Sequence, residues 1–322
     1  MSLLHRFKYS TALAVACLIA TGCANQTKSS IPYAAPGLSA LNNPGFEHAA
    51  NGSFLYVSDS GTDDVQVYGW PKPKNPVATL TGFNEPQGAC ADTTGNVFIT
   101  NTGDFNILKY KGGATSPMQT LDDPDGYPVG CSFDPRSGDL AVTNIINGSY
   151  GQGNIVIYAG ATGTPRVITS KKLSKPYFDR YDGSGNLFIS GLDSAYAPVF
   201  AELPAHSKHI TIPCGPSIFG SDSFPGSIGW DGKYIVIEGM NARGVGVFRL
   251  SGCKKVGFTP IGGASDIVQF VIAGNRLIGP DAGNADVELY PYPKGGSPVT
   301  TLTGFSEPIG AAVTSSTKKA PQ

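Results

Sequence analysis

Acidic and amide residues recur at comparable places along the chain, each close to the end of a short apolar run. Carboxylate and amide oxygens are the ligands that Ca²⁺ prefers, so a converging set of them could hold this ion. Asp and Asn are also selected by turns, where their side chains accept backbone N–H groups, and the sequence leaves both interpretations open. The candidate metal ligands are Asp59, Asn101, Asn144, Glu238 and Asp281.

Histidine and serine offer little for hydrolytic chemistry in this sequence. A serine hydrolase needs a nucleophile with a base in hydrogen-bond reach, and the sequence contains no G-x-S-x-G motif. His206 and His209 lie three residues apart in the segment PAHSKHI, a spacing that shares one face of a helix but not of a strand. We therefore expect a surface hairpin there, and we predict neither a catalytic residue nor an organic cofactor.

The elements that position these residues come from a repeated unit. From Phe54 onward, a short apolar run, a polar loop and a second run ending in an aromatic residue recur along the chain. The closing aromatics are spaced alternately 42 and 48 residues apart, and such a period of short strands indicates propeller blades. The 42 glycines and 25 prolines also favour strands joined by tight turns. The closing aromatics are Tyr68, Tyr110, Tyr158, Phe200, Phe248 and Tyr290.

The first and last repeats match each other best. The segment PVATLTGFNEP begins at Pro76, and PVTTLTGFSEP begins 222 residues later at Pro298, which is five blade periods. The chain therefore starts at the second strand of a blade and ends with a first strand. We predict an all-β, six-bladed β-propeller in which the C-terminal strand 308–314 completes the N-terminal blade and closes the ring without free edges.

Cysteine positions follow from the same repeat. Four cysteines lie in the repeated region, an even number that favours two disulfides in an oxidising compartment, with three pairings possible. When the repeated P-x-G segments are aligned, Cys131 matches Ala89, and Cys90 lies one residue further along its strand. Side chains of successive strand residues point to opposite faces, so the two cysteines, on adjacent blades, point toward each other. We predict a Cys90–Cys131 disulfide. Cys214 and Cys253 pair by elimination, although one follows an outer strand and the other precedes one.

Residues 86–110 carry the pattern P-x-G-x-x-x-D, followed by GNVFITNTG and NILKY. This pattern resembles the NHL-type repeat, and residues 53–315 are similar to the six-bladed, TolB-like propeller superfamily. Propellers host unrelated activities, so the resemblance implies a fold without a function. Metal-dependent lactonases of the gluconolactonase family share this fold and place acidic and amide ligands at the channel mouth. The alternative function implied is a Ca²⁺-dependent, lactonase-like hydrolase using the five residues above.

The N-terminal sequence predicts an export signal. Basic residues precede an apolar run too short to span a membrane, as in secretory signal peptides. The segment Ala-Thr-Gly-Cys ending at Cys23 resembles the bacterial lipobox, which implies a signal peptide at 1–22, acylation of Cys23 and a lipid-anchored protein of the cell envelope. Ala24 follows, and by the same resemblance the outer membrane is favoured. We expect a flexible tether over 23–52 and a disordered tail over 316–322.

Long loops on one face are the best candidates for binding. In a propeller, the loops joining strands two to three and four to one emerge together around the channel mouth, and two such loops, 144–154 and 213–225, carry aromatics. We therefore expect a non-enzymatic monomer that binds a protein or carbohydrate there. The net charge of −1 disfavours nucleic acid as a partner. The candidate binding residues are Tyr150, Tyr196, Phe219 and Phe224.

Overall fold

The computed structural model describes residues 52–219, 224–241 and 244–314. All of these residues belong to one compact unit. The predicted signal peptide, Cys23, the tether up to residue 51 and the tail from 316 lie outside the described residues. Among the residues described, no helix is long and apolar enough to cross a membrane.

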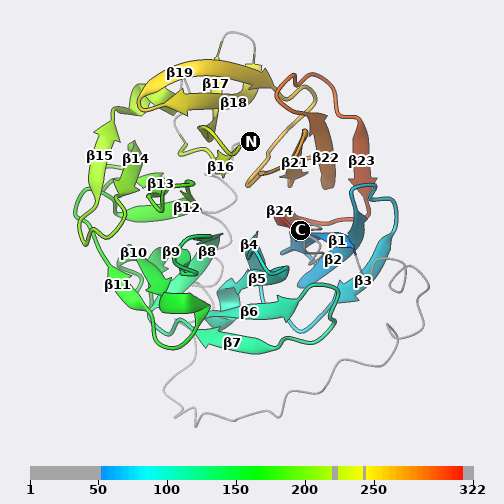
Figure 1. Cartoon of the computed structure of the whole chain (residues 1–322), viewed down its shortest axis with the longest axis horizontal. Helices are drawn as coiled ribbons and strands as arrows, with labels where there is room; N and C mark the ends of the chain where they lie inside the picture. Colours follow the sequence, from blue (N-terminus) through cyan, green and yellow to red (C-terminus); the bar gives the residue numbers. More distant parts are fainter. Residues whose placement is uncertain (1–51, 220–223, 242–243, 315–322) are drawn as a thin grey trace, which may run out of the picture. The chain divides into compact units, whose positions relative to one another are not determined.

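Six four-stranded antiparallel sheets surround a common axis as the blades of a propeller (Figure 1). Blade 1 contains β24 (Pro308–Val313), β1 (Ser53–Asp59), β2 (Asp64–Trp70) and β3 (Pro76–Leu80); blade 2 contains β4 (Pro86–Ala91), β5 (Asn96–Asn101), β6 (Asn106–Lys111) and β7 (Gln119–Asp122). Blade 3 contains β8 (Gly126–Phe133), β9 (Leu140–Asn147), β10 (Gln152–Tyr158) and β11 (Arg166–Ile168); blade 4 contains β12 (Lys175–Tyr181), β13 (Leu187–Leu192), β14 (Pro198–Leu203) and β15 (Thr211–Cys214). Blade 5 contains β16 (Ile228–Trp230), β17 (Ile235–Asn241), β18 (Gly244–Ser251) and β19 (Lys254–Pro260); blade 6 contains β20 (Val271–Ala273), β21 (Arg276–Asp281), β22 (Asp286–Pro291) and β23 (Thr300–Thr303).

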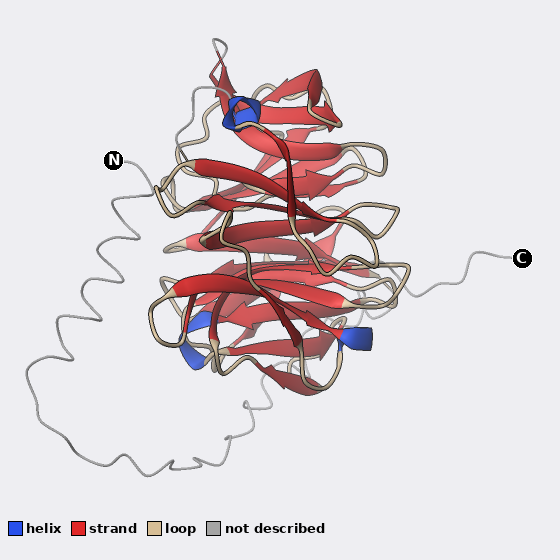
Figure 2. Cartoon of the chain, turned by 90° about the vertical axis from the view of Figure 1, so that its left-hand side faces the viewer, coloured by secondary structure: helices blue, strands red, loops and turns tan. Residues whose placement is uncertain are grey.

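The first strand of each blade lies nearest the axis, and these innermost strands contact one another around the ring (Figure 1). The edge-on view shows the connecting loops gathered on the two opposite faces (Figure 2). Within residues 52–219, 224–241 and 244–314, short 3-10 helices occur in connections as η2 (Thr102–Asp104), η3 (Ala159–Ala161) and η4 (Pro216–Phe219). We call the face with the loops from second to third strands the channel-mouth face.

The apolar core is divided into layers between blades. Strands are apolar on both faces because each blade packs between two others; in β1, for example, all residues after Ser53 are buried. Buried apolar side chains form six clusters, one between each pair of adjacent blades. The six aromatic residues that mark the repeat period are all buried in these layers: Tyr68, Tyr110, Tyr158, Phe200, Phe248 and Tyr290.

Hydroxyl groups connect the blades near the axis. Equivalent positions of second strands hold Ser58, Thr143 and Ser190, and each hydroxyl donates to a backbone carbonyl of the next blade's first strand or its approach. The Thr143 and Ser190 bonds are both 2.8 Å long. Because these hydroxyls are fully buried, leaving them unpaired would cost about 1–3 kcal/mol each. They therefore fix how neighbouring blades meet.

The ring closes as the sequence predicts. β24 pairs with β1 in antiparallel register from Leu55↔Val313 to Asp59↔Pro308, which places the C-terminal strand innermost in the N-terminal blade. The backbone N–H of Thr314 also donates to the carbonyl of Phe54 at 2.9 Å. The predicted all-β, six-bladed architecture is confirmed.

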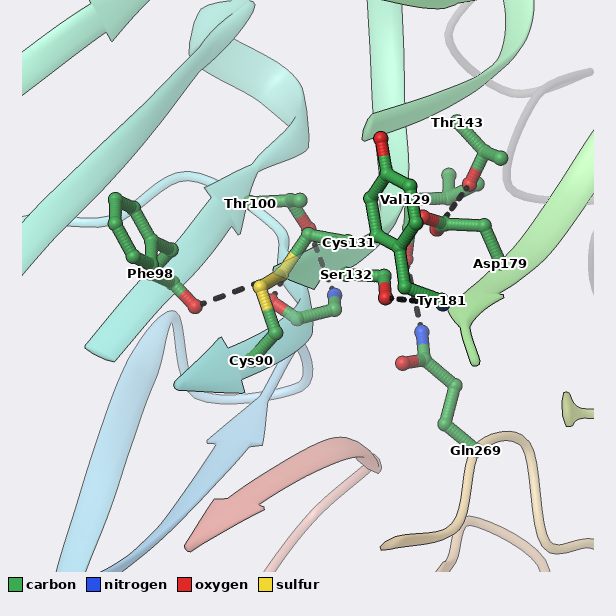
Figure 3. The surroundings of a disulfide bond; sticks show 11 residues. Cys90, Phe98, Thr100, Val129, Cys131, Ser132, Thr143, Asp179, Tyr181 and Gln269 are labelled. Atoms are coloured by element: carbon green, nitrogen blue, oxygen red, sulfur yellow. Dashed lines mark hydrogen bonds between the residues drawn. A yellow bond between two sulfur atoms is a disulfide. The ribbon is translucent and has the colours of Figure 1, made fainter. Parts of the chain in front are cut away.

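Both disulfides are present. Cys90 and Cys131 join the innermost strands of blades 2 and 3, with a Cα–Cα distance of 5.8 Å, as their opposite parity predicts (Figure 3). Cys214 and Cys253 join blades 4 and 5, with a Cα–Cα distance of 5.4 Å. They do not lie at opposite ends, because β15 is short and Cys214 pairs with Phe200 in the middle of β14.

Removing the Cys90–Cys131 disulfide by alanine substitution should lower the free energy of unfolding by about 2–4 kcal/mol. The loss should exceed that from removing Cys214–Cys253. The two disulfides span 41 and 39 residues, so their effects on the unfolded chain are nearly matched. Cys90 and Cys131 are both buried, whereas Cys253 is exposed, so only the first pair leaves a full cavity. Denaturant titration measures both, and equal losses would contradict this account.

Candidate ligand-binding face

Three turns on the channel-mouth face hold an aromatic residue in the left-handed backbone conformation. Phe105, Tyr150 and Tyr196 have φ angles of 56°, 59° and 63°. They lie between the second and third strands of blades 2, 3 and 4, which are neighbours in the ring. A β-carbon disfavours this conformation by about 1–2 kcal/mol. Such backbone strain is found most often at functional sites.

Local hydrogen bonds hold two of these turns in place. The Asn147 side chain accepts the backbone N–H groups on either side of Tyr150, at 3.0 and 2.8 Å. Asp193 does the same around Tyr196, at 2.8 and 2.9 Å. Asx turns of this kind favour left-handed residues. The turn sequence therefore fixes the position of each aromatic ring.

A first aromatic group spans blades 2 and 3. The ring of Tyr127, at the start of β8, lies 4.7 Å from Phe105 and 5.8 Å from Tyr150. Burial, and then the hydrogen bond with Tyr150, raise the pKa of Tyr127 to about 12. The Tyr150 side chain remains 56% exposed. The group thus offers an apolar ring surface edged by phenol hydroxyls.

A second aromatic group continues on blade 4. Tyr177 in β12 lies 5.1 Å from Phe224, which precedes blade 5. The Tyr196 ring is 62% exposed, and the Lys175 ammonium lies 6.0 Å from its centre. Burial lowers the pKa of Lys175. Together the two groups, Phe105/Tyr127/Tyr150 and Tyr177/Tyr196/Phe224, line one sector of the channel-mouth face; we call them the aromatic sector.

The prediction that Phe219 belongs to this face is wrong. Phe219 is fully buried, because η4 inserts it and Ile218 into the apolar cluster between blades 4 and 5. The predicted loop 144–154 is also shorter than expected, since β9 extends to Asn147 and β10 starts at Gln152.

Three of the predicted metal ligands occupy strand ends rather than loops. Asp59, Asn101 and Asp281 are the last residues of β1, β5 and β21, and their side chains are almost wholly buried. Each accepts backbone N–H groups from the loop that leads to the innermost strand of its own blade, at 2.7 or 2.8 Å. These bonds anchor the loops at the channel mouth.

The other two occupy strand interiors. Asn144 lies within β9, is fully buried and donates to the Asp123 carboxylate at 2.8 Å. Glu238 lies within β17. Its place in the β17–β18 pairing matches that of Thr100 in the β5–β6 pairing, one residue before the place of Asn101. Because successive strand residues point to opposite faces, Glu238 is not equivalent to the other four. The five residues come from five different blades.

An acidic group lies at the channel-mouth end of blade 6. The carboxylates of Asp281, Asp286 and Glu288 have oxygens within 4.8 Å of one another. Burial, and then nearby acids, raise the pKa of Asp286; burial also raises the pKa of Glu288, which accepts a hydrogen bond from Tyr290. Oxygen ligands of this kind fit Ca²⁺. Asp281, however, already accepts backbone bonds that anchor the loop.

The propeller axis is nearly closed. Residues from all six blades surround a cavity of about 20 Å³ there, which is room for about one water molecule. The Gln269 side chain donates across it to the Val129 carbonyl at 2.8 Å (Figure 3). Burial raises the pKa of Asp179 on this wall to about 8, despite the Arg180 charge and the Thr143 hydroxyl. This cavity is too small for a ligand larger than water.

Tyr150, Tyr196 and Phe224 were predicted for this face from the sequence, whereas Phe105, Tyr127 and Tyr177 were not. Phe105 stands just before the third strand, where blades 1 and 6 have Asp63 and Ala285, so comparison of the repeats does not mark it as a binding residue. Tyr127 and Tyr177 lie near the start of innermost strands, where an aromatic residue is indistinguishable from core in the sequence.

Comparisons with known proteins support the fold alone. No protein-family model matches the sequence, and no curated protein matches it. A chain from the crystal structure of a nidogen/laminin complex is 14% identical with a TM-score of 0.66, covering 82% of this chain and 99% of that one. A protein of unknown function from Bacteroides caccae is 12% identical with a TM-score of 0.57, with the same coverage. This chain is thus similar to known propellers in architecture.

The raised pKa of Asp179 predicts a pH dependence of stability. The pKa of Asp179 is ordinary in the unfolded chain and about 8 in the folded one, so the folded state binds the proton more tightly. The free energy of unfolding therefore falls as the pH rises from the unfolded pKa toward 8. Asp123, with a pKa of about 6, titrates earlier. As the pH rises from 6 to 8, we expect the free energy of unfolding of Asp179→Asn to increase by about 1–3 kcal/mol relative to that of the wild type. Denaturant titrations at both pH values measure this. A parallel change in wild type and variant would contradict the prediction, and the exposed Asp104→Asn serves as control.

Proposed function

We propose that this protein is a non-enzymatic, lipid-anchored propeller that binds a protein or carbohydrate on the aromatic sector. The observation that carries the proposal is the placement of Phe105, Tyr150 and Tyr196 in left-handed turns on three adjacent blades. Glycine or asparagine would occupy these positions at lower cost. Asp63 and Ala285 adopt the same left-handed conformation between the second and third strands of blades 1 and 6, so the fold sets the backbone there. What supports a ligand is that three neighbouring blades carry a large ring at such turns.

The chemistry of the sector suits recognition by stacking. Tyrosine supplies a large, rigid contact area with little loss of rotamer freedom, and its hydroxyl adds a hydrogen bond at the edge. Tyr150 and Tyr196 are both more than half exposed. Sugar rings and the apolar side chains of a protein both present faces that such rings cover. The Lys175 ammonium beside Tyr196 adds one donor.

The cellular setting follows from the cysteines. Two disulfides fit an extracellular or envelope compartment. The lipobox-like segment before Cys23 supports an anchor in the outer membrane, and the repeat pattern at residues 86–110 supports descent from NHL-type propellers. Metabolic labelling with palmitate, lost in Cys23→Ser, tests the anchor. We propose that the protein acts as a monomer without an organic cofactor.

The alternative is a Ca²⁺-dependent, lactonase-like hydrolase, which the acidic group of blade 6 favours. Bound Ca²⁺ would polarise a lactone carbonyl, and Asp281, Asp286 and Glu288 would hold the ion. Lactone hydrolysis that stops with EDTA and with Glu288→Gln would support this alternative over the binding function.

Tyr196→Gly should strengthen the fold while weakening binding. Glycine relieves the left-handed strain, so we expect the free energy of unfolding to rise by about 1 kcal/mol. Loss of the ring should reduce affinity about tenfold for whichever probe binds the wild type, in a panel of neutral oligosaccharides and envelope proteins.

Val299→Ala is the matched control, because Val299 is 53% exposed near β23 on the outer edge of blade 6. It should leave both quantities unchanged. Thermal unfolding and calorimetric titration give the two readouts. A Tyr196→Gly variant that is less stable and binds equally well would show that the ring is structural, and would contradict the proposal.

A further inference from the structure

A groove lies on the opposite face from the aromatic sector, between blades 3 and 4. It has a volume of about 550 Å³, within the range of small-molecule sites. Its walls are the turns from first to second strand in both blades, near Asp134–Asp139 and Ser184–Gly185, and the β14–β15 hairpin. We call it the blade 3–4 groove.

Cationic side chains surround the blade 3–4 groove. Arg136, Arg166 and Lys208 all line it and are exposed. Among the described residues, the Arg136 guanidinium makes one long hydrogen bond, from Nη1 to the Ser184 carbonyl at 3.4 Å. Three exposed cations at one groove favour an anionic ligand, and arginine pairs with carboxylates through two parallel hydrogen bonds.

The two acids of the groove are partly engaged by the fold. Asp134 accepts the backbone N–H of Arg136 at 2.9 Å and the Ser137 hydroxyl at 2.8 Å. Asp139 accepts the backbone N–H of Gly160 at 2.9 Å. A carboxylate has about four acceptor positions, so each keeps some for a donor on the ligand. A ligand that is both anionic and rich in hydroxyl groups can pair with the cations and donate hydrogen bonds to the two carboxylates.

Tyr181 lines the groove together with the apolar Ile157 and Leu203. The tyrosine is only 7% exposed, and no residue in the described part of the chain accepts a hydrogen bond from its hydroxyl. Its backbone is fixed by a 2.8 Å bond from its N–H to the Ser132 hydroxyl (Figure 3). Burial keeps its pKa well above the usual range, so the hydroxyl is a neutral donor at physiological pH. Because Tyr181 lines the groove, its hydroxyl is placed to donate to a ligand bound there.

We propose that the blade 3–4 groove binds an acidic saccharide, with the sugar carboxylate on Arg136 and Arg166 and the ring above Tyr181. The apolar residues cover the C–H face of the ring, and Asp134 and Asp139 accept its hydroxyl groups. The volume suits about one or two sugar residues. An acidic peptide offers the carboxylate but fewer hydroxyl donors for the two aspartates, so the saccharide is the better match.

The test uses the full exported protein and digalacturonic acid as probe, in calorimetric titration. Lactose is the uncharged sugar of similar size, and a Glu-Glu dipeptide is the acidic peptide. We expect digalacturonic acid to bind at least about tenfold more tightly than either. Arg166→Gln and Arg136→Gln should each weaken it about tenfold, and Tyr181→Phe, which removes one hydroxyl only, about fivefold.

Lys74→Gln, an exposed cation outside the groove, is the control and should change nothing. Tyr196→Gly should also leave this binding intact, which separates the groove from the aromatic sector. Equal affinity for lactose, preference for the dipeptide, absence of binding at millimolar probe, or full affinity in Arg166→Gln would each overturn the proposal.

Discussion

Pairing of β24 with β1 is the interaction on which the rest of the structure depends. It joins residues 249 to 258 positions apart in one antiparallel ladder, from Leu55↔Val313 to Asp59↔Pro308. Without it, blade 1 would lack its innermost strand, and the apolar cluster between blades 6 and 1 would lose Ala311. All other strand pairings join strands that are close in the sequence, so this pairing turns a row of blades into a ring.

The closed ring provides the rigidity that strained turns need. Six apolar layers and the buried hydroxyls of Ser58, Thr143 and Ser190 hold each blade against the next. Turns between second and third strands then project from fixed ends. On such a frame, the left-handed conformations of Tyr150 and Tyr196 cost little of the total stability. The two faces carry different surfaces, aromatic at the channel mouth and cationic in the blade 3–4 groove.

The sequence repeat made the fold predictable, and the prediction failed at positions where one blade departs from the repeat. The match of Pro76 with Pro298 identified both the blade number and the closing strand, because strand order follows from it. The offset of Cys90 gave the first disulfide for the same reason. The prediction placed Glu238 one register position away from where it lies. In blades 1 to 3 the two adjacent positions carry Ser or Thr and Asn or Asp, but blade 5 has none of these residue types at either position, so the sequence does not tell the two positions apart.

The candidate sites were harder to predict, because burial depends on neighbours outside the repeat. Phe219 and Tyr150 both lie in polar, glycine-containing segments, yet η4 carries Phe219 into the core while an Asx turn holds Tyr150 in solvent. The blade 3–4 groove combines turns from two blades with the β14–β15 hairpin. Its cations are far apart in the sequence, so no single motif contains them.

Native-state hydrogen exchange across the ring tests the central claim most directly. If β24 closes the propeller, the amides of Gly310 to Ala312 should exchange only through global unfolding, as slowly as those of the central strand β5. Denaturant dependence should then be the same for both strands. Faster exchange of β24 by local fraying, with β5 still protected, would show that the ring holds together without its closing strand and would contradict the account.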